Sequence, residues 1–298
     1  MKILLLGKNG QVGWELQRAL APLGELVALD FDSPGPLGAD FSKPESLAAT
    51  VRAVMPNIIV NAAAHTAVDR CESEPELAHA LNAAAPAVLA REAAALAAWL
   101  LHYSTDYVFD GSGTDFRLED APTGPLSVYG RTKLEGEAAI RSSGCRHLIL
   151  RTSWVYAARG GNFAKTMLKL ATERDTLSVI DDQIGAPTGA DLLADISAHA
   201  LRSALTRPEV AGTYHAAAAG ETSWYGYARH VIEFARRAGR PIKVAADAVV
   251  PIPTSAYPTP AARPRNSRLD TAKLRGTFGL VMPTWQVGVE RMLTEILT

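Results

Sequence analysis

The stretch Lys2-Ile-Leu-Leu-Leu-Gly-Lys-Asn-Gly-Gln-Val-Gly13 decides the fold of this 298-residue chain. Residues 2–6 form an apolar run that is long enough for a buried strand and too short to span a membrane. Residues 14–20 follow the glycines and have apolar side chains at helical spacing. A strand, a glycine turn and a helix in this order form a dinucleotide-binding fingerprint of the G-x-x-G-x-x-G type.

Each of the three positions of the fingerprint requires glycine for a different physical reason. Gly7 allows the tight turn, Gly10 lets the backbone approach a pyrophosphate, and Gly13 lets the helix pack closely on the strand. The unpaired N–H groups at the start of the helix then face the phosphates. An ordinary glycine-rich turn is the alternative, but the flanking strand and helix favour a bound dinucleotide.

Asp30 ends the next apolar run and lies 17 residues beyond Gly13. A carboxylate at this point accepts hydrogen bonds from the adenosine ribose and repels a 2′-phosphate. No arginine follows it directly, so we expect a site that accepts NADH and need not exclude NADPH. The alternative is that Asp30 only caps a turn at the end of its strand.

Strands and helices alternate through the first half of the chain, as in a parallel sheet. We predict strands at 2–6, 26–30, 57–61, 98–104 and 147–151, and helices at 11–21, 44–54, 76–97, 128–142 and 163–174. The alternation becomes irregular after about residue 150. We therefore predict a Rossmann-type doubly wound parallel α/β sheet over residues 1–150. Residues 151–298 would form mainly a smaller C-terminal substrate-binding lobe, with some segments returning to the first domain.

Composition excludes several classes of protein. The net charge of −1 gives no reason to expect a nucleic-acid or membrane surface. The two cysteines, Cys71 and Cys145, form no spacing typical of zinc sites. The first residues enter a strand directly, and the apolar stretch 83–101 is interrupted by proline and charged residues. We therefore expect a cytoplasmic enzyme with no nucleic-acid or membrane partner.

Tyr129 and Lys133 are four residues apart in a segment predicted to be helical, so their side chains share one face. A free phenol has a pKa of about 10, and a nearby ammonium group lowers that value. Such a pair could transfer a proton to or from a sugar oxygen. On its own the spacing is weak, because most such pairs lie on a solvated helix face.

Two short segments follow predicted strands at the sheet edge where open α/β folds bind ligands. The small side chains of Ala62, Ala63 and Ala64 would let a cofactor lie close to the backbone, or they merely pack there. Thr105, between Ser104 and Asp106, would hydrogen-bond a substrate oxygen or the Tyr129 hydroxyl. The proline-rich stretch 251–268 reads as a surface loop, although its three arginines also suit a diphosphate.

Taken together, several segments resemble the extended short-chain dehydrogenase/reductase superfamily and, more closely, its dTDP-4-dehydrorhamnose reductase family. These segments are 7–13, 61–69, 104–109, 129–133, 151–156, 162–168, 182–189 and 264–269, and they cover essentially the whole chain. The resemblance implies reduction of the C4 ketone of dTDP-4-dehydro-β-L-rhamnose with NADPH or NADH. This is the last step of dTDP-L-rhamnose biosynthesis, whose product supplies lipopolysaccharide or another carbohydrate.

The resemblance also implies a role for each matching residue. Tyr129 would protonate the C4 oxygen, while Lys133 would lower the pKa of Tyr129 and bind the nicotinamide ribose. Thr105 would tune the proton transfer and, with Asp106, contact the sugar. Trp154 would line the sugar-nucleotide site, unless it is a core aromatic. The cofactor would meet Gly10, Gln11 and Val12 at its pyrophosphate, Asp30, Asp40 and Phe41 at its adenosine end, and Ala62, Ala63, Ala64 and Tyr103 along the remaining path.

The resemblance further implies a homodimer. Some family members form metal-linked dimers through carboxylates at positions that match Glu15, Asp191 and Glu295. A Mg²⁺ ion at a dimer interface is therefore considered, but Asp191 is one methylene shorter than the glutamate expected there. We assign no metal ligands.

Three alternatives share parts of this pattern. A sugar-nucleotide 4,6-dehydratase would have an Asp-Glu pair after the threonine, whereas this chain has Asp106-Tyr107. A 4-epimerase would retain NAD and show no net cofactor oxidation. A non-catalytic subunit, such as the regulatory subunit of methionine adenosyltransferase, is disfavoured by the intact set of Thr105, Tyr129 and Lys133. Turnover of a ketosugar nucleotide separates the last alternative from an enzyme.

Overall fold

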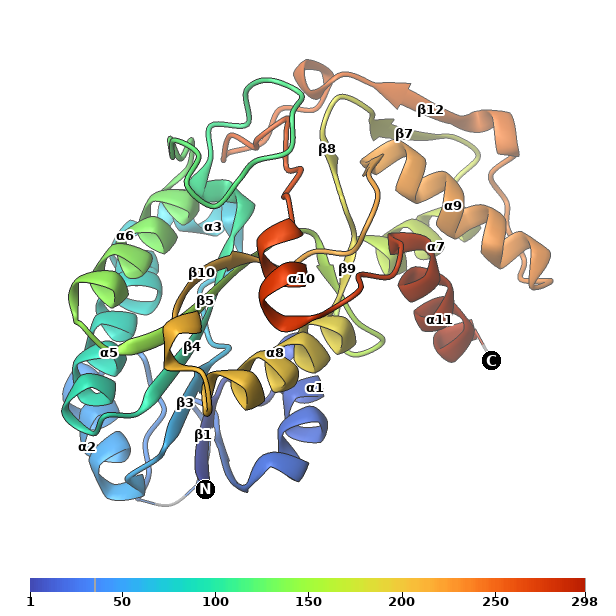
Figure 1. The fold of residues 1–298 in the computed structure, drawn as a ribbon. Helices are drawn as coiled ribbons and strands as arrows, with labels where there is room; N and C mark the ends of the chain where they lie inside the picture. The colour runs from blue at the N-terminus through green and yellow to red at the C-terminus, as the bar shows by residue number, and fades with distance from the viewer. Residues whose placement is uncertain (35, 298) are drawn as a thin grey trace.

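A six-stranded sheet forms the centre of the protein, whose computed structural model describes residues 1–34 and 36–297 (Figure 1). Its strand order is β10-β5-β4-β3-β1-β2, and every neighbouring pair is parallel. The order reverses between β1 and β3, which makes this the switch point of a doubly wound fold. The predicted Rossmann-type architecture is confirmed. The strands are β1 (Lys2–Leu6), β2 (Glu25–Leu29), β3 (Ile58–Asn61), β4 (Trp99–Thr105), β5 (Arg146–Thr152) and β10 (Gly212–His215).

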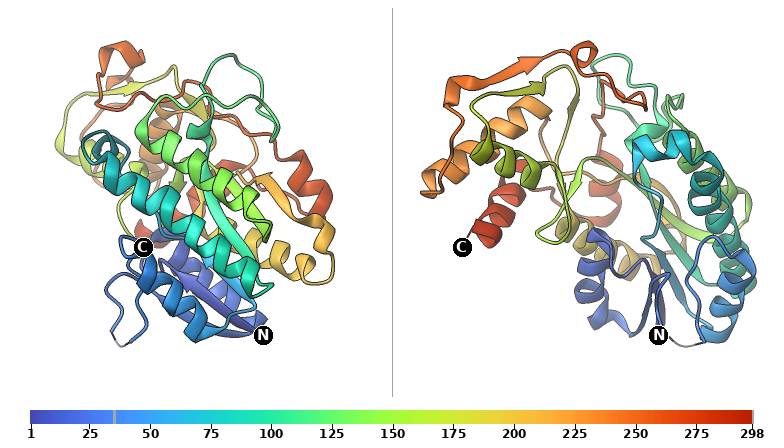
Figure 2. Two further views of the ribbon diagram at one scale, coloured as in Figure 1. Left: turned by 90° about the vertical axis from the view of Figure 1, so that its left-hand side faces the viewer. Right: turned by 180° about the vertical axis from the view of Figure 1, so that it is seen from behind.

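Helices cover both faces of the sheet (Figures 1 and 2). Alternate side chains of β1 point to opposite faces, so Ile3 and Leu5 join one core cluster while Leu4 and Leu6 join another. Burial on both faces explains why the strands are continuous apolar runs. The first cluster includes α1 (Gln11–Leu20) and α8 (Ala190–Ala204), and the second includes α2 (Pro44–Val54), α5 (Ala85–Ala95) and α6 (Val128–Ser142).

The five predicted strands of the first half lie within one residue of the observed ones. The helix predicted over 76–97 is instead divided into α4 (Pro75–His79), a π-helical turn over Ala80–Ala84, and α5. Asn82 in this turn is buried and donates to the His65 carbonyl and the Thr132 hydroxyl, so the turn packs against α6. The short helix α3 (Val68–Ser73) was not predicted.

The second half of the chain contributes both to the sheet and to a separate cluster. Helix α8 packs on α1, and β10 pairs with the edge of β5. The other helices surround Tyr227 and Trp285 in a lobe at the upper right of Figure 1. The domain division at residue 150 stays a prediction. The lobe contains α7 (Phe163–Glu173), α9 (Trp224–Arg237), α11 (Trp285–Leu297), β6 (Val155–Tyr156), β7 (Leu177–Ile180), β8 (Ile184–Gly185), β9 (Thr188–Gly189), β11 (Thr222–Ser223) and β12 (Val249–Ile252), with α10 (Ala272–Phe278) beside β10.

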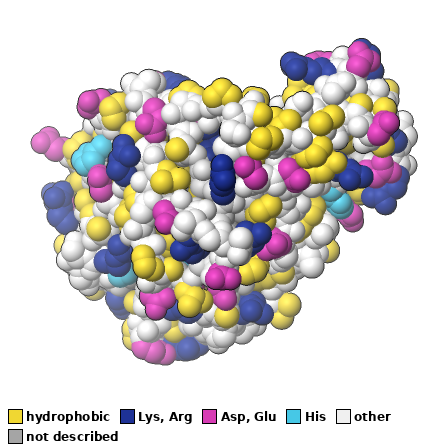
Figure 3. All heavy atoms as spheres, turned by 90° about the horizontal axis from the view of Figure 1, so that it is seen from above, with side chains coloured by type: hydrophobic (Ala, Val, Ile, Leu, Met, Phe, Trp, Pro, Cys, Tyr) yellow, Lys and Arg dark blue, Asp and Glu magenta, His cyan; other side chains and the backbone are white. Residues whose placement is uncertain are grey.

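Acidic and basic side chains are interspersed on the face shown in Figure 3, and neither sign forms a continuous patch there. Within residues 1–34 and 36–297, no helix combines the length and the apolar character needed to cross a membrane.

A buried ion pair fixes α6 against β5. The Arg151 guanidinium donates to both carboxylate oxygens of Glu137, at 2.9 Å from Nε and 2.7 Å from Nη2. Their side chains are 4% and 0% exposed. Arg151 also donates to the Glu119 carbonyl at 3.0 Å, and Arg141 donates to Glu137 at 2.8 Å. Because both charges have hydrogen-bond partners in a buried setting, removal of one would leave the other uncompensated.

We therefore expect Glu137→Ala to lower the free energy of unfolding by about 3–5 kcal/mol, the usual cost of breaking a buried ion pair. Urea denaturation measures this loss. Glu135→Ala, on the exposed face of the same helix, is the matched control and should change stability by no more than about 0.5 kcal/mol. Equal losses in the two variants would show that the pair does not hold α6 in place.

Candidate active site

The glycine turn between β1 and α1 has two glycines that the fold itself requires. Gly7 has φ of 87°, and a Cβ there would lie 2.8 Å from the Ala62 carbonyl carbon. A Cβ on Gly13 would lie 1.9 Å from the Gly7 oxygen. Gly10 differs, because the nearest atom to a Cβ there would be 3.5 Å away. The internal packing therefore leaves space at Gly10, as the approach of a pyrophosphate requires.

The start of α1 also suits a phosphate group. No side chain caps its N-terminus, so the first N–H groups are not satisfied in that way. Gln11 is the first helical residue, and its buried Oε1 has no hydrogen-bond partner among the described residues. Val12 packs against the first core cluster. These features fit the predicted dinucleotide site.

Asp30 lies directly after β2 and ties this strand to the glycine turn. Its Oδ2 accepts from the Asn9 N–H at 2.9 Å, and its Oδ1 accepts from the Phe31 N–H at 2.8 Å. The capping alternative is thus realised, and the ribose contact stays a prediction. Asp40 and Phe41 lie between β2 and α2, where Phe41 is buried and hydrogen bonds from Ser42 and Lys43 lower the pKa of Asp40.

The carboxyl ends of β3 and β4 bring the next set of predicted residues together. Asn61 pairs with His102 in the sheet, so Ala62–Ala64 and Tyr103–Asp106 meet at one edge. Thr105 Oγ1 accepts from the Tyr107 N–H at 3.2 Å and donates to Asp106 Oδ1 at 3.1 Å. Burial raises the pKa of Asp106 to about 6, although hydrogen bonds from Ser267 and Thr105 act in the opposite direction.

Helix α6 places Tyr129 at the carboxyl ends of β3 and β4. Ser127 caps the helix by accepting from the Gly130 N–H at 3.2 Å. A Cβ on Gly130 would lie 2.3 Å from the Tyr107 carbonyl oxygen, so glycine is needed for the close approach of α6 to residues 106–108. The rings of Tyr107 and Tyr129 then meet edge to face, with their centroids 5.5 Å apart. Burial raises the pKa of Tyr129, and a hydrogen bond with Thr105 partly offsets this effect.

Lys133 lies one turn further along α6 and is buried. Its Nζ donates to the Tyr103 carbonyl at 2.6 Å and lies 3.2 Å from His102 Nε2. Burial lowers the pKa of Lys133 to about 8. Tyr129 and Lys133 therefore both reach the end of β4, but the pKa of Tyr129 is raised rather than lowered. Burial is the largest cause of this shift. The lowering of this pKa by Lys133, which the resemblance implies, stays a prediction.

Trp154 follows β5 with a left-handed backbone, at φ of 50°. A bulky residue in this region is strained and must be held by its surroundings, and such outliers cluster at functional sites. Its ring stacks on Trp224 with centroids 3.6 Å apart, and a Cβ on Gly185 would lie 2.9 Å from the indole. Trp154 is half-buried beside the lobe cluster, so it could both pack and contact a ligand.

The three arginines of the proline-rich stretch are each paired with a carboxylate. Arg263 donates to Asp69 at 2.7 Å and Arg268 to Glu221 at 2.6 Å, while Arg265 lies 3.7 Å from Asp182. These pairs join the stretch to distant segments of the chain. The arginines therefore act within the protein in this structure, and the diphosphate interpretation gains no support.

The structure gives no support for Mg²⁺. Asp191 accepts from Arg291 at 2.9 Å, and Glu15 lies 3.6 Å from Arg18. Across residues 1–34 and 36–297, no group of three or more His, Cys, Asp or Glu side chains is arranged to hold a metal ion.

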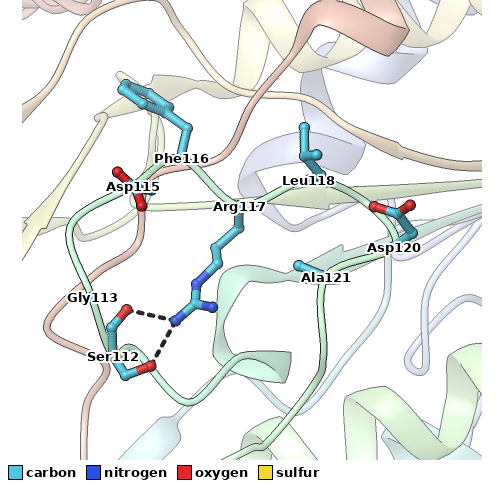
Figure 4. A pocket seen from close by; sticks show the side chains of 8 residues that line it. All are labelled: Ser112, Gly113, Asp115, Phe116, Arg117, Leu118, Asp120 and Ala121. Atoms are coloured by element: carbon cyan, nitrogen blue, oxygen red, sulfur yellow. Dashed lines mark hydrogen bonds between the residues drawn. The ribbon is translucent and has the colours of Figure 1, made fainter.

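Sequence reasoning missed His102, which contacts Lys133, and Tyr107, which packs on Tyr129. A histidine inside a strand predicted to be buried on both faces was the available signal for His102. A surface cavity enclosed by residues between Ser112 and Ala121 contains none of the predicted site residues (Figure 4). Arg117 there donates to the Ser112 carbonyl and hydroxyl, and its backbone pairs with Arg268 and Asp270, so the cavity lies in a loop that is joined to the segment 266–270.

Comparison with known proteins agrees with this geometry. The family model of the RmlD substrate binding domain matches residues 1–298. The dTDP-4-dehydrorhamnose reductase of Escherichia coli is 60% identical over 298 residues, which are 100% of this chain and 99% of the relative. A crystal structure of a dTDP-4-dehydrorhamnose reductase from Clostridium acetobutylicum is 34% identical, with a TM-score of 0.90 and full coverage of both chains.

A second solved structure is that of the dTDP-4-dehydrorhamnose reductase from Bacillus anthracis in complex with NADP. It is 33% identical, has a TM-score of 0.87 and covers 99% of each chain. Sequence and fold therefore agree over the full length of the chain. This chain belongs to the dTDP-4-dehydrorhamnose reductase family.

Proposed function

We propose that this protein reduces the C4 ketone of dTDP-4-dehydro-β-L-rhamnose to dTDP-β-L-rhamnose, with NADPH or NADH as the reductant. The observation that carries the proposal is the meeting of Thr105, Tyr129 and Lys133 at the carboxyl end of β4. This edge lies beside the switch point, where open α/β sheets bind their ligands. The name and identity of the Escherichia coli relative support the same reaction.

The cofactor, when bound, supplies the hydride. Tyr129 donates the proton to the C4 oxygen as a general acid, and its raised pKa means that the phenol is protonated before the transfer. Thr105 orients the phenol and stabilises the phenolate that forms. Asp106 and Trp154 contact the sugar nucleotide. Lys133 binds the nicotinamide ribose from its position beside the Tyr103 carbonyl.

The dinucleotide binds along the edge that starts at the glycine turn. We assign its pyrophosphate to Gly7, Gly10, Gln11, Val12 and Gly13, because the space at Gly10 faces the free N-terminus of α1. We assign the adenosine end to Asp30, Asp40 and Phe41, and the remaining path to Ala62, Ala63, Ala64 and Tyr103. The homodimer implied by the resemblance and the cytoplasmic location expected from the composition stay predictions.

Tyr129→Phe should lower kcat by roughly 10²–10⁴-fold, because the variant lacks the proton that general acid catalysis requires. Loss of reduced-nicotinamide absorbance with dTDP-4-dehydro-β-L-rhamnose measures this effect. Tyr225→Phe, a half-buried tyrosine of α9 outside the proposed site, is the control and should retain the wild-type rate. Near-normal turnover of Tyr129→Phe would remove this residue from the mechanism.

Gly10→Ala and Gly13→Ala should impair different properties: the first should weaken cofactor binding, and the second should lower the stability of the fold. The Cβ at position 13 would meet the backbone of Gly7, so this variant should lose about 1–3 kcal/mol of stability or more. The Cβ at position 10 meets only ordinary contacts, so thermal unfolding should stay unchanged. Its NADPH affinity, measured by fluorescence titration, should fall roughly tenfold or more, about 1.4 kcal/mol. Unchanged affinity would place the pyrophosphate elsewhere.

Asp30→Ala should favour NADPH over NADH, because the carboxylate no longer repels a 2′-phosphate. We expect the ratio of kcat/KM with NADPH to kcat/KM with NADH to rise roughly tenfold. This change corresponds to about 1.4 kcal/mol, which the repulsion between two nearby negative charges can supply. Asp32→Ala removes a neighbouring carboxylate that does not bind the Asn9 N–H, and it should leave the ratio nearly unchanged. Equal ratios in both variants would mean that Asp30 only caps the turn.

A further inference from the structure

The segment that contains β8 and β9 has no role in the proposed mechanism, yet its residues hold Trp154 in several ways. The Thr188 N–H donates to the Trp154 carbonyl at 3.2 Å. A Cβ on Gly185 would lie 2.9 Å from the indole, so glycine leaves the space that this ring occupies. Gln183 is buried and binds Trp224, whose ring stacks on Trp154. The segment therefore fixes both the backbone and the ring of Trp154.

The hydrogen bonds behind Trp224 run in one direction. An indole N–H can only donate, so the atom of Gln183 that lies 3.1 Å from Trp224 Nε1 is the carbonyl oxygen. The amide nitrogen of Gln183 donates to the Thr254 hydroxyl at 3.1 Å, and that hydroxyl donates to Asp182 Oδ1 at 2.5 Å. The Thr254 N–H donates to the same oxygen at 2.7 Å. A carboxylate thus anchors the chain of hydrogen bonds that ends at Trp224.

Trp154 lies close to the residues that the proposed mechanism uses. The last residue of β5 pairs with Thr105 in the parallel sheet, and Trp154 lies two residues beyond that point. A Cβ on Gly185 would also lie 3.1 Å from Ser267 Cβ, and Ser267 hydrogen-bonds Asp106. Contacts through Gly185 and Ser267 therefore connect the indole to the Asp106 carboxylate.

Packing alone does not explain how firmly this ring is held. Trp154 has φ of 50°, a strained conformation for a bulky residue that persists only where the surroundings fix it. The residue is nevertheless only half-buried, so part of it stays accessible. We propose that Gln183, Gly185 and Trp224 are positioning residues, which hold this indole as the surface on which the sugar of the substrate lies. The proposal rests on the proposed function, in which Trp154 contacts the sugar nucleotide.

The chemistry of the sugar suits such a surface. dTDP-4-dehydro-β-L-rhamnose carries a 6-deoxy sugar, whose methyl group and C–H bonds pack well on a flat aromatic ring. Thr105 and Asp106 supply the few polar groups that fix the orientation of a ligand in an apolar site. Because the indole is already held by Trp224, it need not be ordered when the sugar binds. We therefore expect the positioning residues to act on the affinity for the sugar nucleotide.

Gly185→Ala tests the proposal directly, because its Cβ would displace the indole. Gln183→Leu is a second variant of similar size, which removes the acceptor of the Trp224 N–H. Gly276→Ala is the matched control, since a Cβ there meets nothing within 4 Å beyond the backbone of its own helix. The indole N–H signals in ¹H–¹⁵N correlation spectra report on the tryptophans without any turnover, and Trp154→Phe identifies the signal of Trp154.

We expect dTDP-β-L-rhamnose to shift the Trp154 signal of the wild-type protein. Gly185→Ala and Gln183→Leu should shift this signal before any ligand is added. Both should raise the KM for the sugar nucleotide by roughly tenfold, on the scale of a lost aromatic contact. Their kcat and their KM for NADPH should stay near the wild-type values, because the indole contributes binding rather than proton transfer. Gly276→Ala should match the wild type in every measurement.

An unchanged Trp154 signal in both folded variants would overturn the proposal, as would a displaced indole with an unchanged KM. Calorimetric binding of dTDP-β-L-rhamnose to the wild-type protein without a shift of the Trp154 signal would overturn it as well. In these cases the proposed function still stands. A protein that neither binds this product nor reduces dTDP-4-dehydro-β-L-rhamnose would instead contradict the proposed function, and the proposal would fall with it.

Discussion

The position of α6 depends on the buried pair of Glu137 and Arg151. Because both charges are desolvated, sliding or rotation of the helix would expose one of them to an apolar interior without its partner. The pair lies one turn from Lys133 and two turns from Tyr129, so it sets the register of both side chains at the end of β4. Gly130 adds the second constraint, since only glycine allows the helix to approach the Tyr107 carbonyl. The stability of the fold and the proposed proton transfer by Tyr129 therefore depend on the same contacts of α6.

The first half of the fold could be predicted because its signals are local. Apolar runs such as Ile58–Asn61 mark strands buried on both faces, and the glycine turn marks the first crossover. The π-helical turn at Ala80–Ala84 could not be read in this way, because it follows from the packing of Asn82 against α6. Strand β10 is only four residues long, and its place in the sheet is decided by its pairing with β5.

The site was predictable to the level of residue type and spacing. The i, i+4 relation placed Tyr129 and Lys133 on one helix face, and the strand ends placed Thr105 near them. The direction of the Lys133 amine was not predictable, because it depends on the register that pairs Asn61 with His102 across two strands. The ion pairs of the proline-rich stretch were not predictable for a similar reason, since Asp69, the partner of Arg263, lies far away in the sequence.

The return of β10 to the sheet has a consequence for how the chain folds during synthesis. Strand β5, with the apolar run Leu148–Leu150, is complete long before residues 212–215 leave the ribosome. Until then its outer edge presents unpaired N–H and C=O groups, the kind of template that recruits other chains. Pairing across such a long sequence separation is intrinsically slow. The nascent first half therefore passes through a stage in which the edge of β5 is unpaired and prone to aggregation. A chaperone that covers this edge would act at this stage.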